Sequence, residues 1–186
     1  MVAGQSWGCN VVLQLAADHP QRVRAVACVD GGLGDIADRF STWAECERAL
    51  APPRLAGLPA AGFADRLRSA HPDWPETGIE GVLGCFEVRP DGTLAPWLTY
   101  DRHLEVLRGM WGHRLSSLLP RLAMPVLFLP ADDPGTPEWT AAKRGGADAA
   151  LASLADGKVV WIDGQHDLHA QHPEVVAEHL RGQAGG

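Results

Sequence analysis

Val2-Ala3-Gly4-Gln5-Ser6-Trp7-Gly8, near the start of the 186-residue chain, contains the pattern Gly-x-Ser-x-Gly. In this pattern a sharp turn from a strand into a helix exposes the serine hydroxyl, and small neighbours leave room for the turn. The helix that begins here aims free backbone N–H groups at the serine. The stretch therefore predicts Ser6 as a nucleophile, with the Trp7 N–H as a donor to an oxyanion. The same letters also fit an ordinary glycine-rich turn before a helix, since the chain has 21 glycines.

The residues after Ser6 favour a helix and then a buried strand. Apolar residues recur at helical spacing over 11–16, and Pro20 ends that helix. Residues 23–29 form an apolar, β-rich run that closes at Asp30-Gly31-Gly32. A strand that is apolar without alternation is typical of a parallel sheet covered on both faces.

Residues 119–186 return to alternating strands and helices. Strands are expected over 125–129 and 158–162, and helices over 139–154 and 173–181. Strands separated by helices predict right-handed crossovers and a parallel sheet.

Residues 33–118 differ from both flanks. They hold four of the seven tryptophans. Pro90-Asp91-Gly92 is strong turn chemistry and predicts a short hairpin over 87–94, and residues 102–110 have helical spacing. This segment is interpreted as an insertion and not as another strand–helix repeat.

Two further candidate residues follow the two late strands. Asp133 lies in the stretch 129–135 that follows the first of them, where a carboxylate can orient a histidine during acyl transfer. The neighbouring Asp132 lies in the same loop, and a turn-capping role for either residue stays open. His166 follows the last strand and is the predicted general base, which takes the proton from Ser6 and returns it to the leaving group.

His169 and His172 lie close to His166 in the sequence, and three histidines could bind zinc. Their spacing matches no metalloenzyme motif, and Asp133 already gives His166 a partner. We therefore expect no metal and no cofactor, with His169 and His172 as surface or helix-capping residues.

The chain order Ser, Asp, His, each after a predicted strand, is typical of one class of serine-triad fold. With these motifs the sequence resembles the α/β-hydrolase family. Residues 2–8 look like its fifth strand and nucleophile turn, 23–32 like the sixth strand, 124–133 like the seventh with its acid, and 158–166 like the eighth with its histidine. Pro130 stands where the family commonly has a glycine three residues before the acid, so the resemblance implies Asp133 as the acid and Asp132 as the second choice.

The resemblance implies an α/β fold class: a partial α/β-hydrolase fold with the half of the parallel sheet equivalent to strands five to eight. Residues 1–32 and 119–186 would form the core, and residues 33–118 the lid. The family has four more strands and a helix before the nucleophile, and the loop after its third strand supplies a second oxyanion donor. We therefore expect a truncated gene product or a mis-set start codon, with an open sheet edge.

The expected function is that of a serine hydrolase acting on an ester, thioester or related acyl bond of a small molecule. The tryptophan-rich lid suggests a substrate with an apolar part, although these residues fit the lid's own core equally well. The alternative is a non-catalytic remnant or half-domain that needs the missing strands or a partner chain, or that self-associates through its open edge.

Composition restricts the partners and the compartment. A net charge of −7 argues against nucleic acid and against an anionic membrane surface. No apolar run reaches the roughly 20 residues that span a bilayer, and the first residues do not resemble a signal peptide. The four cysteines form no C-x-x-C pair, which is typical of a reduced chain, so we expect a cytoplasmic protein.

Overall fold

Four short parallel strands form the main sheet of the protein, which a computed structural model describes over residues 1–185. In spatial order they are β1 (Val2–Gln5), β2 (Val26–Val29), β5 (Val126–Leu129) and β7 (Gly157–Val159). All three pairings are parallel. Both central strands are fully buried, as their unbroken apolar sequences predict.

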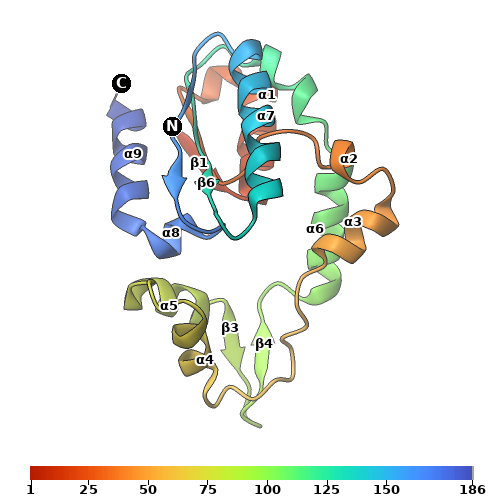
Figure 1. The fold of residues 1–186 in the computed structure, drawn as a ribbon, viewed down its shortest axis with the longest axis vertical. Coiled ribbons are helices and arrows are strands. Elements are labelled where there is room, and N and C mark those ends of the chain that lie inside the picture. Colours follow the sequence, from red (N-terminus) through yellow and green to blue (C-terminus); the bar gives the residue numbers. More distant parts are fainter. Residues whose placement is uncertain (186) are drawn as a thin grey trace.

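Helices cover both faces of this sheet (Figure 1). One face packs against α1 (Trp7–Asp18) and α7 (Pro137–Ser153), and the other against α8 (Leu168–Gln171) and α9 (Pro173–Gly185). Alternate strand residues serve the two faces, because successive side chains of a strand point in opposite directions. The predicted parallel α/β fold is therefore confirmed.

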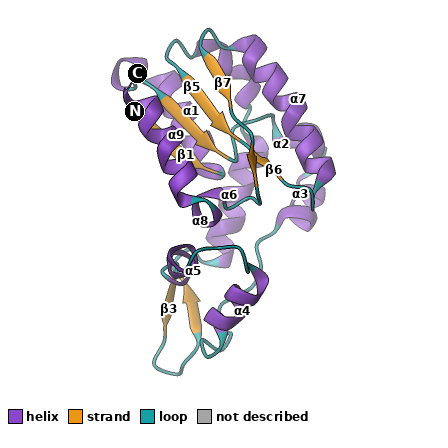
Figure 2. Cartoon of the chain, turned by 60° about the vertical axis from the view of Figure 1, so that its left-hand side comes forward, coloured by secondary structure: helices purple, strands orange, loops and turns teal. Residues whose placement is uncertain are grey.

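The segment between β2 and β5 adds no strand to the main sheet. It contains α2 (Ile36–Arg39), α3 (Trp43–Leu50), α4 (Phe63–Ala70), α5 (Glu76–Leu83), the antiparallel hairpin β3 (Phe86–Val88) and β4 (Leu94–Pro96), and α6 (Tyr100–Gly112). The predicted hairpin and the helix over 102–110 are confirmed. In Figure 2 the hairpin, α4 and α5 form a lobe beyond one end of the sheet. That residues 33–118 act as a lid stays a prediction.

This lobe touches the sheet lobe through α5 and α8. A Cβ atom at Gly78 would lie 2.3 Å from the carbonyl oxygen of Ala170, so the two helices meet backbone to backbone. The contact lies close in sequence to His166.

Several boundaries differ from the prediction. The strand expected over 158–162 is divided into β7 and β8 (Ile162–Asp163), and β8 pairs with β6 (Ala131–Asp132) in a small second sheet. The last helix continues past Gly182, because one glycine costs only about 1 kcal/mol in a helix. Short 3-10 turns lie at Pro20–Arg22, Leu115–Ser117 and Leu119–Arg121.

One edge of the main sheet is formed by β1, which within residues 1–185 pairs only with β2. Beside it, Trp7, Val11 and Leu15 are exposed on α1. These residues are four apart, so they form one apolar stripe along the helix. No helix of residues 1–185 has the length and apolar character needed to cross a bilayer.

Candidate active site

Ser6 occupies a strained turn between β1 and α1. Its φ of 51° lies in the left-handed region, which non-glycine residues rarely adopt. The Ser6 N–H donates to the Val29 carbonyl at 3.0 Å and so ties the turn to β2. Such strain costs on the order of 1–3 kcal/mol and persists where the surroundings enforce it.

The two glycines beside Ser6 are not equivalent. A Cβ atom at Gly4 would lie 2.2 Å from the backbone of Gly8, so only glycine fits at position 4. A Cβ atom at Gly8 would meet nothing within 4 Å. The steric requirement expected on both sides of Ser6 therefore holds on one side.

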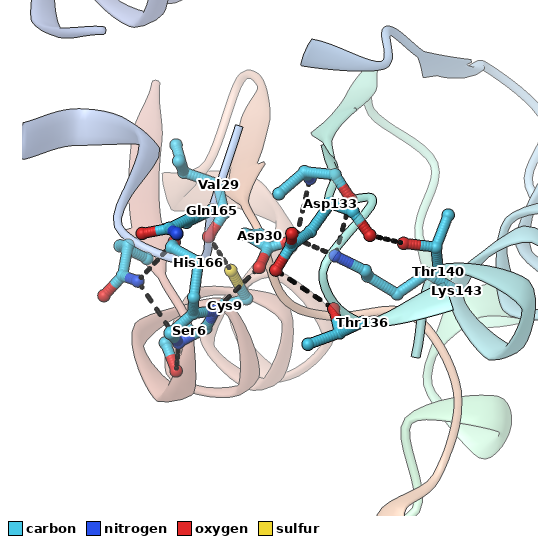
Figure 3. A network of polar contacts seen from close by, with 12 residues as sticks. Ser6, Cys9, Val29, Asp30, Asp133, Thr136, Thr140, Lys143, Gln165 and His166 are labelled. Atoms are coloured by element: carbon cyan, nitrogen blue, oxygen red, sulfur yellow. Dashed lines mark hydrogen bonds and ion pairs between the residues drawn. The ribbon is translucent and has the colours of Figure 1, made fainter. Parts of the chain in front are cut away.

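His166 lies in the loop after β8, with its ring against Ser6 (Figure 3). Its Nε2 atom is 2.9 Å from Ser6 Oγ. The loop is fixed from behind, since the Gln165 N–H donates to the Gln171 side chain at 2.7 Å. The structure thus brings together Ser6 and His166, two residues that are 160 positions apart and that the sequence analysis paired.

The carboxylate on the other side of the ring belongs to Asp30. Its Oδ2 atom is 2.6 Å from His166 Nδ1, and its side chain is 5% exposed. A carboxylate at this distance accepts, so Nδ1 carries the hydrogen and the lone pair of Nε2 faces the serine hydroxyl. Ser6, His166 and Asp30 form one continuous line of hydrogen bonds (Figure 3).

Asp133, which the sequence analysis assigned to this position, does not contact His166. Its carboxylate accepts from the Gly135 N–H at 2.8 Å and from the Thr136 hydroxyl at 3.1 Å, which is the local turn geometry of Asp before a glycine. Asp132, the second choice, pairs with Arg144 at 2.6 Å.

Sheet order explains why Asp30 takes this place. β2 lies between β1 and β5, so the end of β2 is the strand end directly beside Ser6. Gly31 allows the close approach, because a Cβ atom there would lie 2.5 Å from the Ser6 carbonyl oxygen. The signal was present in the sequence: Asp30 directly follows the buried strand β2, whereas Asp133 lies four residues after the end of β5.

The two partners shift each other's pKa. Burial raises the pKa of Asp30, but hydrogen bonds from His166, the Ala131 N–H and Lys143 outweigh it, so the net pKa is lowered. The hydrogen bond to Asp30 raises the pKa of His166 above its ordinary value, although partial desolvation and Lys143 oppose this.

Comparison of the sequence with models of known protein families identifies the family of this chain. Residues 1–179 match the model of the alpha/beta hydrolase family. The chain belongs to the α/β-hydrolase family. A search of curated protein sequences finds no match.

Solved structures share the fold of this α/β-hydrolase at low sequence identity. E-2-(acetamidomethylene)succinate hydrolase matches with a TM-score of 0.71 and 18% identity over 99% of this chain and 66% of its own. The thioesterase domain from the curacin biosynthetic pathway matches with a TM-score of 0.63 and 18% identity, over 97% of this chain and 66% of its own. A bromoperoxidase from Bacillus anthracis matches with a TM-score of 0.65 and 16% identity, over 99% of this chain and 66% of its own. The chain thus spans 66% of the length of each of these structures.

A cavity of about 500 Å³ lies beside Ser6, Asp30 and His166 in this α/β-hydrolase. Its apolar lining includes Leu33, Ile36, Leu50, Val106, Leu107 and Met110. These residues come from the loop after β2 and from α2, α3 and α6, so most of the apolar wall belongs to residues 33–118.

Tryptophans contribute less to the cavity than the sequence suggests. Trp7 and Trp139 line it. Trp43 and Trp111 pack on each other with their ring centroids 6.2 Å apart, and Trp74 is buried among other side chains. The apolar character of the cavity therefore comes mainly from aliphatic residues of the insertion.

The predicted oxyanion donor has a suitable position. Trp7 is the first residue of α1, so its backbone N–H has no acceptor inside the helix, and the residue lines the cavity. Its role as a donor remains a prediction.

The histidines near the end of the chain are not gathered around one point. Within residues 1–185, no group of three or more His, Cys, Asp or Glu side chains is placed to hold a metal ion together. His169 is exposed on α8, and His172 lies at the C-terminal end of that helix.

Proposed function

We propose that the protein is a serine hydrolase that cleaves an ester, thioester or related acyl bond. One observation carries the proposal: the imidazole of His166 bridges the Ser6 hydroxyl, at 2.9 Å, and the buried Asp30 carboxylate, at 2.6 Å. A strained serine, a histidine in the correct tautomer and an orienting carboxylate are the three parts that acyl transfer needs.

In the first half of the reaction, Ser6 Oγ attacks the carbonyl carbon while His166 Nε2 takes the hydroxyl proton. The imidazolium that forms is stabilised by Asp30, and the Trp7 N–H donates to the oxyanion. Collapse of the tetrahedral intermediate breaks the bond to the leaving group, which receives the proton from Nε2. In the second half, water attacks the acyl-serine by the same proton path and releases the acid.

The acid in this proposal is Asp30 and not Asp133. Only Asp30 has the hydrogen-bond geometry to hold the tautomer of His166. Asp133 lines the same cavity, where its carboxylate is occupied by the turn at Gly135.

The proposed substrate is a small molecule with an apolar acyl or alkyl part. A cavity of about 500 Å³ falls within the range of ligand sites in proteins, and its wall is mainly aliphatic. No cofactor enters any step of this chemistry.

A fluorophosphonate probe tests the proposal, because it phosphonylates an activated serine. Labelling is expected in the wild type, absent in Ser6→Ala, and retained in Ser153→Ala, which removes a serine on α7 that only caps the Ala149 carbonyl. A folded wild type that takes up no probe, or equal labelling of Ser6→Ala, would contradict the proposal.

A second candidate is a half-domain without catalytic activity that self-associates. The observation in its favour is the β1 edge with the exposed stripe of Trp7, Val11 and Leu15. A free strand edge beside an apolar surface favours pairing with another chain.

Sedimentation velocity together with labelling separates the two candidates. The Val2 and Ser6 N–H groups donate to the Ala25 and Val29 carbonyls, so by alternation the Ala3 N–H points away from β2, and Ala3→Pro removes this outward donor. Oligomers that Ala3→Pro dissociates, with no probe labelling, support the second candidate. A monomer that is labelled rejects it.

A further inference from the structure

Lys143 reaches from α7 to the carboxylate that holds His166. Its side chain is 16% exposed, which is unusual for a lysine without a function or a partner. The Nζ atom lies 3.0 Å from Asp30 Oδ1 and donates to the Ala131 carbonyl at 2.6 Å. Figure 3 shows Lys143 beside Asp30.

Asp30 is therefore held by donors from three parts of the chain. Oδ1 accepts from the Ala131 N–H at 2.8 Å and from Lys143, while Oδ2 accepts from His166. The two donors on Oδ1 fix the plane of the carboxylate, which leaves Oδ2 directed at the imidazole.

Charge balance gives Lys143 a second effect. Asp30 is almost fully buried, and a buried carboxylate without a cation is costly. With Lys143 present, the carboxylate is compensated even while His166 is neutral, which is the form that can accept the proton of Ser6.

We propose that Lys143 is a positioning residue, which fixes the Asp30 carboxylate toward His166 and shares its negative charge. The inference rests on the proposed serine hydrolase function. Lys143 acts through Asp30: it holds the acid that orients the base.

The charges around His166 give the sign of the effect. Asp30 and, on its own loop, Asp167 favour the imidazolium, whereas Lys143 opposes it. From β1, the neutral amide of Gln5 donates to the His166 carbonyl at 3.4 Å.

The other titratable groups that line the cavity are Asp133 after β6, His103 on α6 and His113 directly after α6. Of these three side chains, none forms a hydrogen bond or ion pair with His166 in residues 1–185. Removal of the Lys143 charge therefore raises the pKa of His166, so the base stays protonated to higher pH.

The test compares Lys143→Met, Lys143→Gln and Lys143→Arg with the control Arg144→Met. Arg144 is the next residue on α7, but it is 52% exposed, pairs with Asp132 and lies over the Trp161 ring. The Arg144→Met substitution therefore removes one positive charge from the same helix without changing a contact of Asp30.

Two readouts are needed. The first is the titration of His166 followed by ¹H–¹⁵N NMR, with the signal assigned by His166→Gln; it requires no turnover. The second is kcat/KM for an aryl ester as a function of pH.

In Lys143→Met we expect His166 to titrate at a higher pH, and kcat/KM to begin its fall on the acid side at a higher pH. The plateau of kcat/KM should fall about 10- to 100-fold, because the acid that orients the base is no longer held in place. Lys143→Arg should restore most of both, and Arg144→Met should match the wild type. If Lys143→Met does not fold, Lys143→Gln decides, since it keeps a hydrogen-bond donor without the charge.

A neutral Lys143 variant with the wild-type midpoint and plateau would overturn the inference, as would an equal shift in Arg144→Met. The failure of the proposed function is a separate result. A wild type that is not labelled by fluorophosphonate rejects the hydrolase, while the NMR midpoint still decides whether the charge of Lys143 acts on His166.

Discussion

At the scale of single residues, the site depends on a hydrogen bond from the imidazole of His166 to the buried carboxylate of Asp30. Asp30 is buried and receives donors on both oxygens, whereas His166 is 57% exposed and free to exchange protons with a substrate. This difference suits an acid that stays ionised and a base that cycles between its two forms.

The pH profile follows from this pair. The hydrogen bond to Asp30 raises the pKa of His166, so kcat/KM should fall as the pH drops through a value above the ordinary histidine pKa of about 6.5. The base is active when neutral, so activity is present above the raised pKa and lost below it. Steady-state kinetics from pH 5 to 9 measures this, and an acid limb at or below 6.5 would contradict it.

Sequence patterns could predict part of this site. Ser6 and His166 were found because each stands at a turn that a strand must precede, and that information is local. The choice between Asp30 and Asp133 is not local, because each lies within a few residues of the end of a buried strand. It depends on which strand end lies beside the nucleophile, and therefore on the order of strands in the sheet.

At the scale of elements, the turn from β1 into α1 depends on one glycine more than on the other. Gly4→Ala should cost about 3 kcal/mol and abolish probe labelling, because the new Cβ overlaps the Gly8 backbone. Gly8→Ala should stabilise the protein by up to about 1 kcal/mol, since alanine is the better helix former and its Cβ meets nothing. Thermal unfolding of both variants measures this; equal effects would refute the steric account of the turn.

The loop that carries His166 is hydrogen-bonded to Gln171, the last residue of α8. Gln171 is buried, accepts from the Gln165 N–H, and donates to Asp73 of the insertion. Gln171→Leu should leave both partners unpaired, lower stability by about 1–3 kcal/mol and lower kcat/KM.

His169→Ala is the matched control for Gln171→Leu, because it changes an exposed side chain on the same helix. Melting temperature and ester hydrolysis should stay near wild type. If both variants have the same melting temperature and rate of ester hydrolysis, the contact between the insertion and the His166 loop contributes to neither stability nor activity.

Element type was predictable where the apolar pattern was strong, and element ends were not. The apolar runs over 23–29 and 125–129 gave the two central strands, yet β2 begins only at Val26. β7 and β8 were read as one strand, because the break between them serves a pairing with β6 that no local pattern encodes.

At the scale of the whole molecule, the cavity is shared between the sheet lobe and the insertion. Ser6, Asp30 and His166 come from the strand ends, and the aliphatic wall comes mainly from α2, α3 and α6. Under the proposed function, catalysis and substrate selection would reside on different parts of the chain, so we expect that one can be altered without the other.

A series of p-nitrophenyl esters tests this division. kcat/KM should rise about three- to fourfold per added CH₂, on the basis of about 0.8 kcal/mol for each buried methylene, until the cavity is filled. Met110→Trp should move the optimum to shorter chains, while Glu105→Gln, an exposed residue of the same helix, should leave it unchanged. An optimum that Met110→Trp does not move would place the acyl chain elsewhere.

The central claim is that Ser6, His166 and Asp30 act as one unit, and the rate of fluorophosphonate labelling in two matched variants tests it most directly. Asp30→Asn should slow labelling by about 10²–10⁴-fold, because the amide no longer holds His166 in the tautomer that accepts the serine proton. Asp133→Asn, which loses only turn contacts, should label within a few-fold of wild type. The reverse result, with Asp133→Asn inert and Asp30→Asn reactive, would contradict the account.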